Sequence, residues 1–154
     1  LCYHSSMDTP MSQGTRCRQL AEYVVFESPL NMLCDSPTNY DREEECTEFI
    51  ATIPTVWEQT IAMNGEIGKY ITMARRKGDV WYVGSLTNWD ARTLTLDLSF
   101  LGAGRWKAEM FHDGVNANRL ASDYQKTVTD IPASRKLTVK MAQGGGCALK
   151  IYKE

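Results

Sequence analysis

The chain lacks several features that would point to a particular class of protein. No apolar run approaches the roughly 20 residues that a membrane-spanning helix needs, so we expect no membrane partner. The formal net charge is only -2, which gives no reason to expect a nucleic-acid partner. The chain opens on Leu1 to His4 without a basic and then apolar leader. We therefore expect that a leader was removed or that the chain is an internal fragment.

Histidine is scarce, and the cysteines do not form a recognisable site. The five cysteines cannot all pair within the chain, and none forms a C-x-x-C pair of the kind that binds zinc or does redox chemistry. A nucleophilic cysteine needs a nearby base, and the sequence places neither His4 nor His112 beside a cysteine. We expect buried, unreactive thiols at Cys2, Cys17, Cys34, Cys46 and Cys147.

Helical spacing is confined to the first third of the chain. Residues 15–26 place apolar side chains on one stripe, which predicts a helix that ends before Pro29. A short apolar run of strand length follows at residues 30–33, and a second helix is predicted over residues 40–51. These elements have no strand partners of their own. Their apolar faces must fold onto the rest of the chain or onto a second copy, and the second case would make a homo-oligomer.

Beyond Pro54 the period changes to that of strands. Short runs rich in Val, Ile, Leu, Thr, Tyr and Trp alternate with turn-forming residues. The clearest alternation of apolar and polar residues lies within residues 92–100. The pattern predicts a mainly β chain that ends in an antiparallel β-sandwich. The predicted strands cover residues 69–75, 80–87, 92–100, 105–111, 126–131, 136–141 and 147–152.

Several motifs of one enzyme family occur in the same order along almost the whole chain. They include Tyr-Val-Val-Phe-Glu-Ser-Pro-Leu-Asn-Met at residues 23–32, Asp-Ser-Pro at 35–37, Pro-Thr-Val-Trp at 54–57, Trp-Tyr-Val-Gly at 81–84, Phe-His-Asp-Gly-Val-Asn-Ala at 111–117 and Gly-Gly-Gly at 144–146. With these motifs the chain resembles glycoside hydrolase family 97, enzymes of gut Bacteroides and relatives that act on α-glucosides or α-galactosides.

The resemblance implies a three-part enzyme with an N-terminal β-supersandwich, a central (β/α)8 barrel and a C-terminal β-sandwich. Residues 1–60 would be the incomplete end of the catalytic barrel, and residues 61–154 the C-terminal antiparallel β-sandwich. The resemblance also implies calcium and an oligosaccharide substrate in the full-length enzyme, a periplasmic or secreted location, and a sandwich that serves packing and oligomerisation. We expect the isolated chain to need no cofactor and to be inactive, since a catalytic site must be held within about half an ångström.

Two glutamates are candidate catalytic residues. Glu27 stands between an apolar run and a proline, which could hold its carboxylate in a partly dry pocket and raise its pKa for acid catalysis. The alternative is a helix-end carboxylate in water. Glu58 lies in Trp-Glu-Gln-Thr, where the family usually shows Trp-Asp-Glu-Thr, and the resemblance implies a role as acid or calcium ligand. Gln59 replaces the usual glutamate, and a neutral amide supplies neither proton nor charge.

Substrate contacts are predicted at Asp35 and among the tryptophans. Asp35 follows the run at residues 30–33, and barrel enzymes carry their chemistry at the C-terminal ends of such strands. Trp57 adjoins Glu58 and could stack on a sugar ring. Trp89, in a turn, is the tryptophan expected to be exposed, whereas Trp81 and Trp106 lie in strand runs and are expected in the core. A stand-alone carbohydrate-binding sandwich that uses Trp89 is therefore an alternative function, as is a structural domain that covers the barrel's end.

Overall fold

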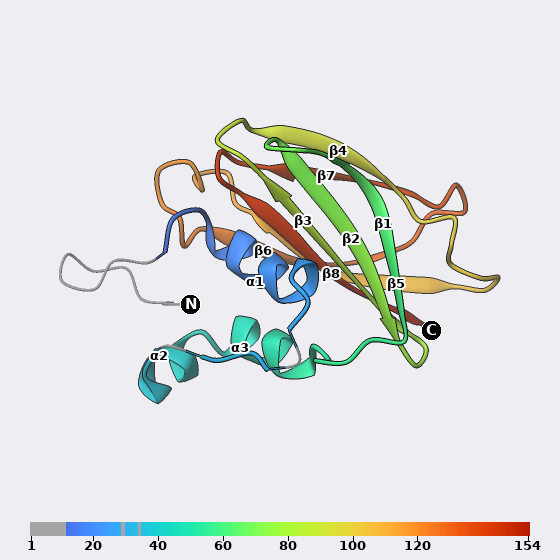
Figure 1. Ribbon diagram of the computed structural model, residues 1–154, viewed down its shortest axis with the longest axis horizontal. Coiled ribbons are helices and arrows are strands. Elements are labelled where there is room, and N and C mark those ends of the chain that lie inside the picture. Colours follow the sequence, from blue (N-terminus) through green and yellow to red (C-terminus); the bar gives the residue numbers. More distant parts are fainter. Residues whose placement is uncertain (1–11, 29, 34) are drawn as a thin grey trace.

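A computed structural model of the chain describes residues 12–28, 30–33 and 35–154. Within these ranges three helices precede eight strands (Figure 1). The helices are α1 (Arg16–Val25), α2 (Pro37–Arg42) and α3 (Glu44–Thr52). The strands are β1 (Gln59–Glu66), β2 (Tyr70–Lys77), β3 (Val80–Thr87), β4 (Arg92–Asp97), β5 (Trp106–Asp113), β6 (Tyr124–Asp130), β7 (Lys136–Met141) and β8 (Gly146–Lys153). The chain is mainly β, as predicted.

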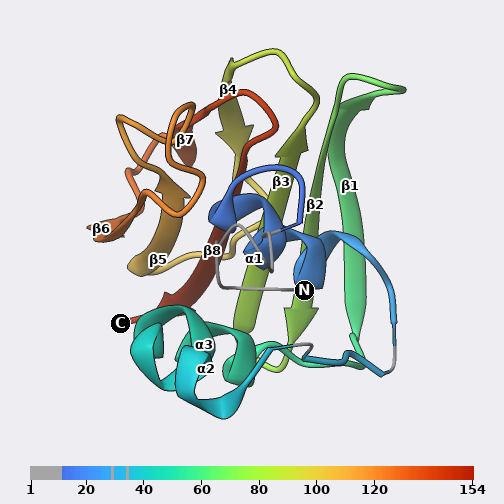
Figure 2. The same ribbon diagram turned by 90° about the vertical axis from the view of Figure 1, so that its left-hand side faces the viewer.

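All the strand pairs are antiparallel and form two sheets of unequal size. The larger sheet has the order β1-β2-β3-β8-β5-β6, and β4 pairs with β7 in a two-stranded sheet. One core, which includes Trp81, Leu96 and Trp106, contains side chains of both sheets. A second core joins Leu20 of α1 and Phe49 of α3 to the larger sheet. Figures 1 and 2 show α1 running over the central strands β3 and β8, with α2 and α3 below it.

Helix α1 is held against the sheet by a close approach at its middle. The Thr15 side chain caps its N-terminus by accepting a hydrogen bond from the Arg18 backbone N–H over 3.2 Å. Leu20 and Val24 are buried on the side facing the sheet. A side-chain carbon built on Gly84 of β3 would lie 2.8 Å from the Ala21 carbonyl oxygen. Only a glycine at this position lets the helix backbone come so near.

The C-terminus of α1 is tied to β2 by Arg75. Its guanidinium donates from Nε to the Val24 carbonyl oxygen over 2.7 Å and from Nη2 to the Val25 carbonyl oxygen over 3.0 Å. The last carbonyls of a helix have no partner within the helix, so a buried cation there satisfies two of them. Arg75 therefore acts as a long-range cap that fixes where the chain leaves α1.

Most of the predicted elements are confirmed, but two details are wrong. The helix predicted over residues 40–51 is two helices, because Ser36 and Pro37 start α2 early and Glu43 adopts non-helical angles (φ -112°, ψ 44°). Residues 30–33 form no strand. Leu30, Met32 and Leu33 are exposed, so this run is not part of a core. The apolar faces of α1 and α3 fold onto the sheet rather than needing a second copy. The division at residue 60 stays a prediction.

Strand β1 was not predicted, because its sequence carries little strand signal. It is an edge strand paired only with β2 among the described strands, and most of its residues are exposed. Ile61 and Met63 alone alternate inward to the core between the sheets. No helix in the described part of the chain is long and apolar enough to cross a bilayer.

Candidate docking surface

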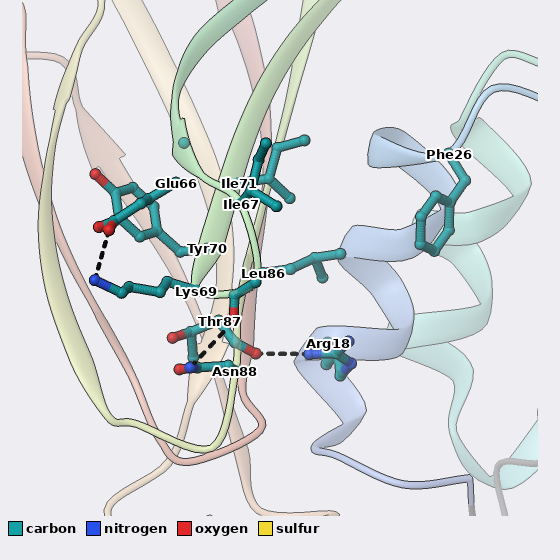
Figure 3. A pocket seen from close by; sticks show the side chains of 12 residues that line it. Arg18, Phe26, Glu66, Ile67, Lys69, Tyr70, Ile71, Leu86, Thr87 and Asn88 are labelled. Carbon is teal, nitrogen blue, oxygen red and sulfur yellow. Dashed lines mark hydrogen bonds and ion pairs between the residues drawn. The ribbon is translucent and has the colours of Figure 1, made fainter.

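An apolar groove of about 550 Å³ separates α1 from the β1–β2 hairpin. Figure 3 shows Phe26 on the helix side facing Ile67 and Ile71 on the hairpin side, with Leu86 of β3 between them. Phe26 is 59% exposed and Ile67 is fully exposed. Large apolar side chains that gather in this way on a surface mark a contact site for another protein or another part of the same protein.

The β1–β2 hairpin carries Ile67 at its tip, in a tight hydrogen-bonded turn. The Lys69 backbone N–H donates to the Glu66 carbonyl oxygen over 2.9 Å, and Gly68 takes the positive φ of 76° that the turn requires. The side chains of Glu66 and Lys69 form an ion pair of 2.5 Å. Their charges cancel, so this pair adds no net charge to the rim of the groove.

Arg18 closes the other end of the groove. Its Nη1 donates to the Thr87 carbonyl oxygen over 2.7 Å, and its Nε pairs with Glu22 at 3.2 Å (Figure 3). Burial raises the pKa of Glu22 and the nearby Arg18 partly offsets that rise. This pair belongs to the wall of the groove, and its carboxylate is already neutralised by its partner.

Leu30, Met32 and Leu33, on the segment after α1, are also exposed, but they do not line the groove. We define the docking surface as Phe26, Ile67 and Ile71 of the groove. Burying an apolar side chain of this size contributes about 1.5 to 3 kcal/mol of favourable free energy. The surface is therefore suited to association with another apolar surface rather than to catalysis.

The four residues predicted for catalysis and substrate binding do not form one site. Glu27 is 81% exposed and lies 3.9 Å from Arg75, whereas Glu58 lies 3.3 Å from Arg76. Arg75 and Arg76 are neighbours in β2, so their side chains leave the sheet on opposite faces. The two carboxylates therefore do not share a pocket. The assignment of either as a catalytic residue stays a prediction that the geometry of the described residues does not support.

Asp35 and Trp57 have structural partners. Asp35 Oδ1 accepts hydrogen bonds from the Ser36 backbone N–H over 2.7 Å and from Asn39 Nδ2 over 2.6 Å, which stabilises the start of α2. No strand precedes it among residues 12–28 and 30–33, so no described strand ends at Asp35 as a barrel strand would. Trp57 packs edge-on against Tyr82, with 5.5 Å between ring centroids, under the Arg75 guanidinium. A ring held in this way offers little free face to a sugar.

Glu58 does not have the surroundings of a calcium ligand. Its carboxylate accepts a hydrogen bond from the Gly78 backbone N–H over 3.2 Å and lies 3.8 Å from the Lys77 ammonium, in addition to Arg76. Two cations already neutralise it, and calcium needs several oxygens converging on one point. Among residues 12–28, 30–33 and 35–154, no group of three or more His, Cys, Asp or Glu side chains is placed to hold a metal ion.

The described thiols are buried, as predicted. Cys17, Cys46 and Cys147 are all fully inaccessible to solvent. Burial raises the pKa of Cys17, and the neighbouring Asp113 carboxylate raises it further. A raised pKa disfavours the thiolate, which is the reactive form of a cysteine. Cys2, Cys34 and His4 lie outside the described residues.

Sequence reasoning missed the docking surface because it overlooked β1. The signal was present in Ile67-Gly68-Lys69, a three-residue loop with a central glycine between β1 and β2. Phe26 was expected only as the end of a helix.

Comparison with known proteins places these features in one family. The family described as "Glycosyl-hydrolase 97 C-terminal, oligomerisation" matches residues 56–152. A retaining alpha-galactosidase from Bacteroides thetaiotaomicron is 58% identical over 149 residues, which are 97% of this chain and 22% of that protein. The chain thus spans about a fifth of the length of this relative.

Solved structures give the same match. A glycoside hydrolase family 97 enzyme from Pseudoalteromonas sp. strain K8, in complex with panose, superposes with a TM-score of 0.87 at 38% identity, over 94% of this chain and 23% of that one. A beta-arabinopyranosidase superposes with a TM-score of 0.78 at 26% identity, over 92% of this chain and 22% of that one.

Proposed function

We propose, because the chain belongs to glycoside hydrolase family 97, that its docking surface joins two copies of the protein. The resemblance seen in the motifs is confirmed, and the chain corresponds to the C-terminal domain of family 97 α-glycosidases. The description of the matched family includes oligomerisation. The observation that carries the proposal is the apolar groove, in which Phe26 and the fully exposed Ile67 face each other.

A symmetric dimer suits the shape of this surface. In a twofold interface the same patch serves both partners, so a protruding side chain of one copy can enter the hollow of the other. Ile67 protrudes at the hairpin tip and the groove lies directly beside it (Figure 3). The charged residues that line the groove are paired, Lys69 with Glu66 and Arg18 with Glu22, so an isoleucine can enter without the cost of burying an unpaired charge.

Sedimentation velocity over a wide concentration range tests this proposal. The unchanged protein should show concentration-dependent self-association, and Ile67→Asp should weaken it by about tenfold or more, since a carboxylate would be buried among apolar side chains. Val128→Asp is the matched control, because Val128 is also exposed but lies on β6 at the other edge of the sheet. A compact monomer at every concentration, or an equal effect of both variants, would refute the interface.

We further propose that the full-length protein cleaves α-galactosides with retention of configuration. The support is the 58% identity to a retaining alpha-galactosidase. Hydrolysis of aryl α-galactosides and aryl α-glucosides by the full-length protein, with NMR of the first-formed anomer, tests this. The 154-residue chain alone should hydrolyse neither, because glycosidases need two carboxyl groups about 5 to 9.5 Å apart across the bond and Glu27 and Glu58 do not make such a pair.

Two further proposals rest on the resemblance to the family. A periplasmic or secreted location is tested by fractionating cells that express the full-length protein. A calcium requirement of the full-length enzyme, with ligands other than Glu58, is tested by loss of activity on chelation and its recovery with added calcium.

A further inference from the structure

One end of the sandwich is assembled from four segments that are distant in sequence. The Thr15 backbone N–H donates to the Gly144 carbonyl oxygen over 3.1 Å, and the Arg16 N–H donates to the Ala121 carbonyl oxygen over 2.8 Å. The Gly144 N–H in turn donates to the Asn88 carbonyl oxygen over 2.8 Å. The start of α1 and the β3–β4, β5–β6 and β7–β8 connections are thereby fixed to one another. Loops held on a rigid scaffold in this way are typical positions for ligand contacts.

Trp89 stands exposed on this assembly. It is 62% exposed, and its turn is braced because Asn88 Oδ1 accepts a hydrogen bond from the Asp90 backbone N–H over 3.0 Å. The indole rests on Gly144, where a side-chain carbon would lie 2.6 Å from the ring carbon Cζ3. Gly144 also has a φ of 60°, which a residue with a side chain rarely adopts. The backbone thus supports one part of the ring while much of its surface stays open.

The surroundings of Trp89 are hollowed and polar. It lines two hollows of about 270 Å³ and about 180 Å³. The smaller hollow shares Asn118 and Gln143 with a third, of about 580 Å³, which is also lined by Gln125. We call the smaller hollow and the third hollow together the loop-end groove. The side chains of Asn118 and Gln143 are exposed and make no hydrogen bond to another described residue.

The β7–β8 turn, which carries Gln143, is held in place by Asp113. Asp113 Oδ2 accepts hydrogen bonds from the Ala142 backbone N–H over 2.8 Å and from the Gly146 N–H over 3.2 Å, on either side of Gln143. Asp113 is therefore a positioning residue for the β7–β8 turn. Its Oδ2 is occupied by these bonds. The exposed carboxamides of Asn118 and Gln143 lie where the two hollows meet, and Arg119 and Lys140 line the groove to either side of them.

We propose that the loop-end groove binds a neutral oligosaccharide, at a site separate from the docking surface. An exposed indole offers a flat apolar face to the C–H side of a pyranose ring. A carboxamide carries both donors and an acceptor, which matches the adjacent hydroxyl groups of a sugar. The two hollows share lining residues and have volumes of about 580 and 180 Å³, which gives room for more than one sugar ring. This site is additional to the assembly function and does not depend on it.

NMR titration of the protein with stachyose and with maltotetraose tests the proposal. The indole N–H signal of Trp89 should shift saturably with at least one of them. Trp89→Ala should weaken binding by about tenfold, and Trp89→Phe, which keeps a flat ring, by only a few-fold. Gln143→Ala should weaken it by about threefold. Val128→Ala, an exposed apolar change on β6, is the control and should leave the titration unchanged.

Two results would overturn the site. One is the absence of a saturable shift up to the solubility limit of both sugars. The other is a titration that Trp89→Ala leaves unaltered. If Trp89→Ala instead changes the sedimentation of the protein and neither sugar binds, the exposed indole is a protein contact and the sugar site is wrong.

Discussion

Replacing Arg75 by leucine tests how α1 is fixed to the sheet. Arg75 is only 4% exposed, and two of its hydrogen bonds reach the last carbonyl oxygens of α1. Hydrogen bonds from a charged donor contribute about 1.5 to 3 kcal/mol each, and leucine would leave both buried carbonyls without a donor. We therefore expect the free energy of unfolding to fall by about 3 to 6 kcal/mol, against a total of about 5 to 15 kcal/mol for a typical domain.

Urea denaturation followed by circular dichroism measures this change. The free energy of unfolding of Arg75→Lys should lie between those of Arg75→Leu and the unchanged protein, since an ammonium keeps the charge but not the planar set of donors. Glu27→Gln is the control, because its carboxylate is 81% exposed and 3.9 Å from Arg75, and such pairs contribute about 1 kcal/mol or less. If Arg75→Leu lowers the free energy of unfolding by less than about 1 kcal/mol, water replaces the guanidinium and the cap contributes little stability.

Three further changes have defined outcomes. Gly84→Ala should lower the free energy of unfolding by about 1 to 3 kcal/mol in the same urea assay, because the new methyl group would lie 2.9 Å from Val24 Cβ. Burial raises the pKa of Asp113 above its ordinary 3.8, so the folded state holds that proton more tightly. The stability that this contributes is complete below pH 3.8 and is lost as the pH rises through the raised pKa. In urea melts at increasing pH above about 4, the free energy of unfolding should therefore fall less for Asp113→Asn than for the unchanged protein. Glu58→Gln should leave calcium calorimetry unchanged, with no binding heat before or after the substitution, since Arg76 and Lys77 already neutralise the carboxylate.

The elements that could be predicted are those whose residues carry their own signal. The stripe that includes Leu20 and the alternation around Leu96 each bury one side of an element, and both predictions are confirmed. Trp89 was expected to be exposed because it lies in a turn, and it is. Trp81 and Trp106 were expected in the core because they lie in strand runs, and they are buried there.

The features that could not be predicted depend on contacts between distant residues. Arg75 caps a helix that ends 50 residues earlier, and no local pattern shows which carbonyls an arginine will reach. Strand β1 buries only Ile61 and Met63, so its alternation is too short to identify it. Residues 30–33 are apolar, which in a longer chain is as typical of an interface as of a core strand. The four candidate site residues were chosen by motif, and a motif does not fix the direction in which a side chain points.

The apolar groove and the larger hollow beside Trp89 share lining residues, which limits the choice of substitutions that can separate the two proposals. Arg18 and Asn88 line both the apolar groove and the larger hollow beside Trp89. Arg18 also bonds to the Thr87 carbonyl oxygen, so changes there would alter both surfaces and the end of β3. Ile67 lines the apolar groove but neither hollow beside Trp89, whereas Trp89 lines both of those hollows but not the apolar groove. Substitution of these two residues therefore distinguishes self-association from sugar binding, and each variant serves as a control for the other.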